Sequence, residues 1–203
     1  MNTVLVETFI PKLRQLVNVS LPPLLNDALV QAAQEFCRES KLVRYTRKLA
    51  SVNQNDVIAV VGSSELNGIG EGAFRACEVF SVIQAASTSD ALPMALGSEY
   101  NKLSRDTLMF NIDALDVDVA CAIEPSPGST HLPEILFDEY AQGICYGAAH
   151  LLLIQPDSDW FNPQLAQEYR QWFQESIREA YRFSVESGNT STFVNPTRER
   201  NFF

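Results

Sequence analysis

The hydrophobic residues of this 203-residue chain repeat at helical spacing near both ends and at strand spacing between them. Up to about Ser40, and again from Leu132, apolar positions recur three and four residues apart, as on one face of a helix. From Leu42 to about Gly128, apolar residues instead alternate with polar ones, as in a strand with one buried face. The pattern therefore predicts an α+β fold in which a β-rich segment is inserted between two helical parts.

The N-terminal helical part is expected to contain a short amphipathic segment at residues 10–17 and a long helix that begins after Leu21. Pro22 and Pro23 suit the first turn of this helix, because proline lacks an amide that would have no helical partner there. Polar residues fill the positions between its apolar ones, so one face is predicted to be buried. The apolar positions are Leu25, Ala28, Leu29, Ala32, Ala33 and Phe36.

The C-terminal helical part is expected to contain two long helices separated by a break at residues 155–159. The first is predicted to begin at Leu132, with Pro133 in its first turn. The second is predicted to begin at Pro163, with Asn162 as its N-cap, and to end at Gly188. Its buried face is expected to consist of Leu165, Tyr169, Trp172, Phe173, Ile177 and Ala180.

These segments predict an antiparallel helical bundle with one N-terminal and two long C-terminal helices, formed by residues 1–41 and 130–188. Residues 42–129 are expected to form a small inserted β-domain. This domain should be antiparallel, because no helical pattern lies between its strands to make parallel crossovers. Residues 189–203 are expected to form an extended C-terminal tail.

The charge of the chain constrains its partners. Charged residues make up 20% and hydrophobic residues 46% of a globular composition, and the net charge is −10. Such a surface repels phosphate, so tight or specific DNA binding is not expected, although DNA can pass such a surface without adhering. The N-terminus lacks the pattern of a signal peptide, and the longest apolar stretch, residues 144–154, is too short to span a bilayer. We therefore expect a soluble protein with no membrane partner.

The cysteines and histidines do not form a reactive pattern. Cys37, Cys77, Cys121 and Cys145 are far apart in apolar runs, with no CxxC pair, so we expect buried thiols and neither a zinc site nor a redox motif. The two histidines, His131 and His150, would lie about 28 Å apart along an ideal helix axis. His150 is expected to be a hydrogen-bonded core residue. The sequence thus predicts no enzyme and no cofactor.

One acidic cluster, Asp113, Asp116 and Asp118, has the residue types that bind Mg²⁺ or Ca²⁺. It lacks the glycine and terminal glutamate of an EF-hand. On a strand, Asp116 and Asp118 project from one face and Val117 and Val119 from the other, which is typical of a solvated face. In a ring-shaped oligomer, Asp116 and Asp118 would be candidates for lining an acidic channel.

Gly143 and Gly147, one helical turn apart, allow another backbone to approach closely. The sequence leaves open whether that backbone belongs to the same subunit or to a neighbour.

The order and spacing of three segments form a further pattern. Residues 21–40 are a helix that ends in Phe-Cys-x-x-Ser and runs into the β-rich part. A strand then leads to Glu124-Pro125, followed by Leu132-Pro133-Glu134. The third segment is a helix that carries Tyr140, Gly143, Gly147, Ala148 and Leu151 and precedes residues 159–163. Over most of residues 20–187 the chain resembles the head-to-tail adaptor (connector) proteins of tailed bacteriophages, although residues 52–109 match only in being β-rich.

The resemblance implies a structural virion protein with no catalytic residues. It implies a ring, typically of twelve copies, that lies below the portal, joins the capsid to the tail and provides a channel for the genome. The implied partners are other copies of the chain, the portal protein, and a tail or nozzle protein, and DNA passes without specific binding. The implied location is the neck of the virion, with synthesis in the host cytoplasm.

Residues 190–203 lack periodicity and are open to two interpretations, a disordered tail or an extended docking arm. In the adaptor family a C-terminal extension commonly docks on the portal. On this basis, the candidate portal-docking residues are Phe193, Arg198, Arg200, Phe202 and Phe203.

Three alternatives remain at this point. The chain could be another phage neck or tail-completion ring protein, which would contact the tail tube. It could be a small Mg²⁺-dependent cytosolic hydrolase that uses the acidic cluster. It could also be a bacterial regulatory or scaffolding protein that does not enter virions.

Overall fold

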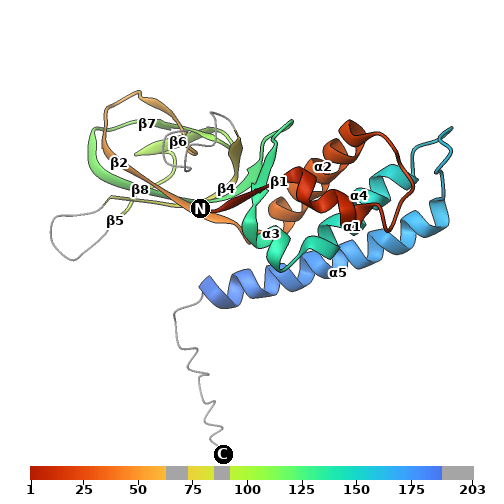
Figure 1. The fold of residues 1–203 in the computed structure, drawn as a ribbon. Helices are drawn as coiled ribbons and strands as arrows, with labels where there is room; N and C mark the ends of the chain where they lie inside the picture. Colours follow the sequence, from red (N-terminus) through yellow and green to blue (C-terminus); the bar gives the residue numbers. More distant parts are fainter. Residues whose placement is uncertain (63–72, 85–91, 189–203) are drawn as a thin grey trace, which may run out of the picture.

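The computed structural model describes residues 1–62, 73–84 and 92–188 of the chain. A β-rich part lies at one end of the molecule and a helical part at the other, and the longest helix runs along the underside in Figure 1. The helical elements are η1 (Val6–Phe9), α1 (Ile10–Leu13), α2 (Pro22–Ser40), α3 (Glu134–Asp138), α4 (Ala141–Leu153) and α5 (Pro163–Gly188).

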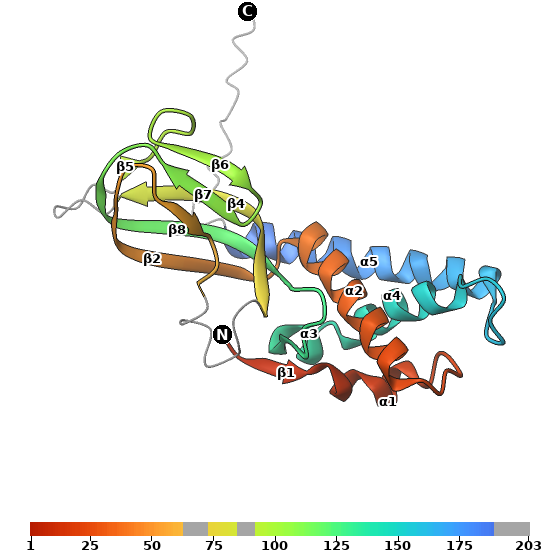
Figure 2. The ribbon, with the colours of Figure 1, turned by 90° about the horizontal axis from the view of Figure 1, so that it is seen from above.

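The strands form three sheets, and every strand pair within them is antiparallel. One sheet has the order β2-β8-β4-β5, the second β3-β7-β6, and the third pairs β1 with β9. Figure 2 shows the first two lying over one another in the β-rich part. The strands are β1 (Thr3–Leu5), β2 (Arg44–Val52), β3 (Val57–Ala59), β4 (Phe74–Gln84), β5 (Leu92–Pro93), β6 (Tyr100–Ser104), β7 (Thr107–Phe110), β8 (Ala114–Pro125) and β9 (His131–Pro133).

The predicted class, α+β, agrees with this architecture, but the predicted bundle of three long helices is wrong. Among the helices of the described residues, only α2, with 19 residues, and α5, with 26, are long. The helix expected from Leu132 is divided into β9, α3 and α4. Pro133 is extended (ψ 133°) and pairs with Thr3 of β1, and Tyr140, at φ −121° and ψ 14°, separates α3 from α4.

Helix α2 has the buried face that its sequence predicts. All six predicted apolar positions are buried, and five of them are fully so; the sixth, Ala28, is 5% exposed. The helix ends where Lys41 adopts a left-handed conformation (φ 52°) and donates its amide hydrogen bond to the Cys37 carbonyl. The Phe36 ring packs 5.2 Å from the Tyr140 ring and 6.2 Å from that of Phe173, measured between centroids. Helix α2 is therefore in contact with the start of α4 and with α5.

The close approach predicted for the two glycines of α4 occurs within one subunit, against α5. A Cβ atom at Gly143 would lie 2.7 Å from Cβ of Ser176, and one at Gly147 would lie 2.8 Å from the ring of Phe173. Phe173 is fully buried. Packing of α4 on α5 thus accounts for both glycines.

Candidate functional site

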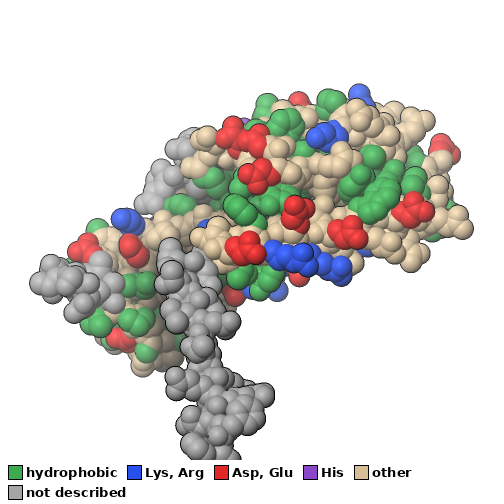
Figure 3. Space-filling model, turned by 90° about the horizontal axis from the view of Figure 1, so that it is seen from below, with side chains coloured by type: hydrophobic (Ala, Val, Ile, Leu, Met, Phe, Trp, Pro, Cys, Tyr) green, Lys and Arg blue, Asp and Glu red, His purple; other side chains and the backbone are tan. Residues whose placement is uncertain are grey.

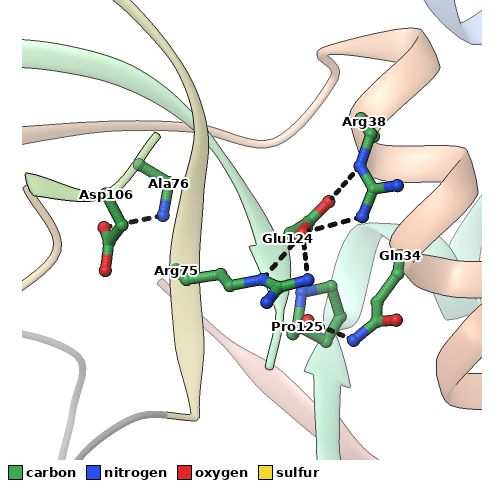
Figure 4. Close-up of polar contacts among 7 residues, drawn as sticks. All are labelled: Gln34, Arg38, Arg75, Ala76, Asp106, Glu124 and Pro125. Atoms are coloured by element: carbon green, nitrogen blue, oxygen red, sulfur yellow. Dashed lines mark hydrogen bonds and ion pairs between the residues drawn. The ribbon is translucent and has the colours of Figure 1, made fainter. Parts of the chain in front are cut away.

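One buried carboxylate connects the helical part to the β-sheets. Glu124, near the end of β8, is only 1% exposed. Arg38 of α2 donates two hydrogen bonds to its two carboxylate oxygens, each 2.9 Å long. Arg75 of β4 approaches Oε1 from the other side, with Nε at 2.8 Å and Nη2 at 2.7 Å (Figure 4). Two arginines from different elements therefore share one buried negative charge.

The electrostatic balance explains why this charge can be buried. An unpaired carboxylate in the protein interior is strongly disfavoured, whereas paired and hydrogen-bonded ones are tolerated. One negative charge on Glu124 balances only one of the two arginine charges. Because the Arg38 and Arg75 side chains are 38% and 40% exposed, water solvates the remaining positive charge. The hydrogen bond with Glu124 raises the pKa of Arg38. The cluster thus holds α2, β4 and β8 in one relative position without an uncompensated interior charge.

Further polar contacts lie at the same joint. Gln34 Nε2 donates to the Pro125 carbonyl at 3.0 Å, and Lys41 forms an ion pair with Glu78. Ser184 of α5 donates to the Ser40 carbonyl at 2.9 Å. In the part of the chain that the structure describes, the buried polar or charged residues are Ser40, Glu124 and Ser184. All three belong to this joint between the helices and the sheets.

Asp106, in the turn between β6 and β7, is a second acidic group with a structural role. Its carboxylate accepts hydrogen bonds from the amides of Ala76 (2.9 Å) and Val61 (3.3 Å). Burial raises the pKa of Asp106 above its ordinary value, although these hydrogen bonds act in the opposite direction. The folded state consequently favours the protonated form more than the unfolded state does.

We predict that Asp106→Asn gains stability relative to the natural protein as the pH rises. Below the ordinary aspartate pKa of about 4, Asp106 is protonated in both states and its contribution to stability is fully present. That contribution is lost as the pH rises through the raised pKa of the folded state, whereas asparagine keeps an acceptor oxygen and does not titrate. Urea midpoints measured between acidic and neutral pH test this, and a difference independent of pH would contradict it.

The three predicted cluster aspartates do not converge on one site. Asp113 is exposed and accepts a hydrogen bond from the Gln54 amide at 2.7 Å. Asp116 is exposed in a left-handed conformation (φ 50°), and Asp118 pairs in register with Lys48 of β2. Within the described ranges, no group of three or more His, Cys, Asp or Glu residues could hold a metal ion. A channel-lining role for Asp116 and Asp118 depends on an assembled ring and stays a prediction.

The cysteines are buried free thiols, as predicted. Burial raises the pKa of Cys37 well above its ordinary value and those of Cys121 and Cys145 to about 12. Reactive thiolates are therefore disfavoured at these positions. His150 is only partly buried, and its Nδ1 lies 3.0 Å from the Ala166 carbonyl, so the predicted hydrogen bond is present.

Trp172 is not on the buried face of α5, contrary to the sequence prediction. It is 41% exposed, whereas the adjacent Phe173, predicted on the same face, is fully buried. The Trp172 ring packs at centroid distances of 5.0 Å from Tyr146 and 5.6 Å from Tyr169. The face of the molecule along α5 mixes such hydrophobic side chains with acidic and basic ones (Figure 3).

Trp172→Ala is therefore expected to lower the free energy of unfolding by only about 1 kcal/mol, the scale of exposed aromatic contacts. Urea denaturation measures this loss, and Gln171→Ala, at an exposed neighbouring position, serves as the control. A loss above about 3 kcal/mol, typical of a buried aromatic residue, would mean that the side chain is buried in solution.

The predicted portal-docking residues Phe193, Arg198, Arg200, Phe202 and Phe203 lie outside the described residues. The sequence analysis does not identify Glu124 or Asp106 as site residues.

Among the described helices, none combines the length and the hydropathy that a membrane-spanning helix needs.

No protein-family model and no curated protein matches the sequence. Among solved structures, the chain is similar to a chain in the neck of an empty GTA particle computed with C6 symmetry. The two are 14% identical, and the match covers 85% of this chain and 95% of the other, with a TM-score of 0.29.

Proposed function

We propose that the protein is a structural subunit of a tailed-phage virion, a head-to-tail adaptor that forms a ring below the portal. In this role it joins the capsid to the tail and provides a channel for the genome. Its partners are other copies of the chain, the portal protein, and a tail or nozzle protein. Its location is the neck of the virion.

The observation that carries the proposal is the joint around Glu124. A closed ring of identical subunits requires each copy to present its two contact surfaces at the same angle. The paired arginines Arg38 and Arg75 fix the β-sheets to α2, and the bond between Ser184 and Ser40 fixes α5 to the end of α2. The buried polar groups are concentrated at this joint, which supports a structural role in which the fixed angle between helices and sheets matters.

The net charge supports the proposed relation to DNA. A charge of −10 on each copy, repeated around a ring, gives a strongly negative assembly. Such an assembly repels the phosphate backbone, so a genome in transit is not retained by the wall.

The proposal is tested by mixing the full-length protein with the portal protein of the same virus and measuring the mass of the complex. The expected result is one complex that contains the portal and many copies of the chain, with portal alone as the control. A chain that stays monomeric and does not bind the portal would contradict the proposal. A parallel mixture with the tail tube tests the alternative: binding to the tube and not to the portal would identify a tail-completion ring.

A further inference from the structure

The last two turns of α5 bury little apolar surface. Among residues 181–187 only Ser184 is buried, whereas Tyr181, Phe183 and Val185 are 45–47% exposed. Helices in proteins are stabilised mainly by burial of an apolar face, and helix ends with few buried contacts open readily. Hydrophobic packing therefore does not account for the order of this end of α5, which lies beneath the β-rich part in Figure 1.

Polar contacts hold the end of α5 in place. Arg44 of β2 donates a hydrogen bond from Nη2 to the Ser184 carbonyl. The Ser184 hydroxyl lies 2.9 Å from the Ser40 carbonyl at the end of α2 and 2.8 Å from the carbonyl of Tyr181 in its own helix. A positive charge near the C-terminal end of a helix is stabilising, because the helix dipole places partial negative charge there. Arg44 therefore fastens the end of α5 to the sheet.

The Arg44 guanidinium is in turn supported by Phe80 of β4. Its Cζ atom lies 5.4 Å from the centroid of the Phe80 ring, within the range of cation–π contacts. The register of β4 on β8 shifts between Val79 and Ser81, so Phe80 is an extra residue in the strand, as in a β-bulge. Because a bulge redirects a side chain, the Phe80 ring is 42% exposed beside Arg44 and not buried in the core.

We propose that Arg44 is a positioning residue for the C-terminal segment, residues 189–203. By holding the Ser184 carbonyl, Arg44 fixes the end of α5 and thereby the point from which this segment leaves the subunit. The inference rests on the proposed function and on the predicted docking of the segment on the portal. Arg44 itself makes no contact with the portal in this role and acts through Ser184.

A fixed starting point favours docking for an entropic reason. A segment that docks loses conformational freedom, and a starting point that also moves adds to this loss. A starting point held at a suitable distance raises the effective concentration of the segment at its binding site. In a ring of identical copies every segment then starts from an equivalent position. Loss of the anchor should therefore weaken portal attachment although the segment itself is unchanged.

Amide order parameters of the full-length subunit, measured by NMR relaxation, test the anchor. Arg44→Met keeps much of the apolar stem and removes the charge and its hydrogen bond. Residues 184–187 should fall from the rigid range, about 0.85, to below about 0.6, whereas residues 166–180 should stay rigid. Unchanged order parameters at the end of α5 would overturn the inference.

Two further variants control for charge. Lys48→Met removes the same charge from an exposed position of β2 and should leave the end of α5 rigid. Arg44→Lys keeps the charge but lacks the planar group that stacks on an aromatic ring, so it should give intermediate order parameters. If Lys48→Met loosens the end of α5 as much as Arg44→Met does, net charge and not the anchor is responsible, which would also overturn the inference.

A double-mutant cycle on portal affinity tests the positioning role. Arg44→Met in the full chain should weaken portal binding at least about threefold, because only chains with an ordered α5 end present the segment ready to dock. In a chain that also carries Phe202→Ala/Phe203→Ala, which removes the predicted aromatic anchors of the segment, Arg44→Met should change the affinity by less than about twofold. Equal losses in both backgrounds would mean that Arg44 acts on stability or contacts the portal directly, and would overturn the inference.

The same measurements separate this inference from the proposed function. If the natural chain binds the portal and Arg44→Met binds it equally well, the inference is wrong and the proposed function is unaffected. If the natural chain does not bind the portal, the proposed function is contradicted and the positioning role is overturned with it.

Discussion

Replacing Arg38 and Arg75 together by methionine is expected to lower the free energy of unfolding by about 3–5 kcal/mol, the cost of leaving a buried charge without its partner. The side chain of Glu124 is 2% exposed, and its carboxylate forms ion pairs and hydrogen bonds with both of these arginines. Methionine keeps the length and much of the apolar stem of arginine, so the loss reports the charge and not the packing.

Urea denaturation at neutral pH measures the effect, and two further variants serve as controls. Arg14→Met/Arg105→Met removes the same charge from exposed positions and should change stability by less than about 1 kcal/mol. Adding Glu124→Met to the double variant should recover most of the loss, because no buried charge then remains. If the double variant is as stable as the natural protein, the joint does not depend on this cluster.

Gly143→Ala/Gly147→Ala is expected to lower the free energy of unfolding by about 2–3 kcal/mol. This is the difference between the cost of overpacking and the gain from the higher helix propensity of alanine. New Cβ atoms at these positions would meet Ser176 and Phe173 at 2.7 and 2.8 Å. Phe173 is fully buried and the Ser176 contact is to Cβ, so neither can move aside without separating α4 from α5. Alanine favours the helix by itself, which offsets part of the overpacking cost.

The matched control for the glycine variant is Gln142→Ala, on the same helix but exposed, where only helix propensity changes. This control should be as stable as the natural protein or slightly more so. Thermal unfolding followed by circular dichroism compares the variants. A glycine variant that matches the control would mean that α4 and α5 are farther apart in solution.

Local pattern was sufficient to predict the features that depend on one helix face or one residue type. The six apolar positions of α2 are buried, and the four cysteines are buried thiols. Both predictions rest on residues whose burial is determined by their own periodicity or polarity. The α+β class followed for the same reason.

The errors arose where distant contacts decide the structure. Pro133 suits the first turn of a helix, but pairing with a strand of only three residues at the N-terminus makes it extended. Trp172 and Phe173 both fit the margin of the apolar face, and the position of α4 decides which is buried. Glu124 would face solvent by strand alternation, but α2, 86 residues away in sequence, covers it.

Electron microscopy of the full-length protein mixed with its portal tests the central claim most directly. The account predicts a closed ring coaxial with the portal, in which each copy keeps the angle between α2 and the β2-β8-β4-β5 sheet seen in the single subunit. Portals without an added ring, or copies attached with different angles between helices and sheets, would contradict it.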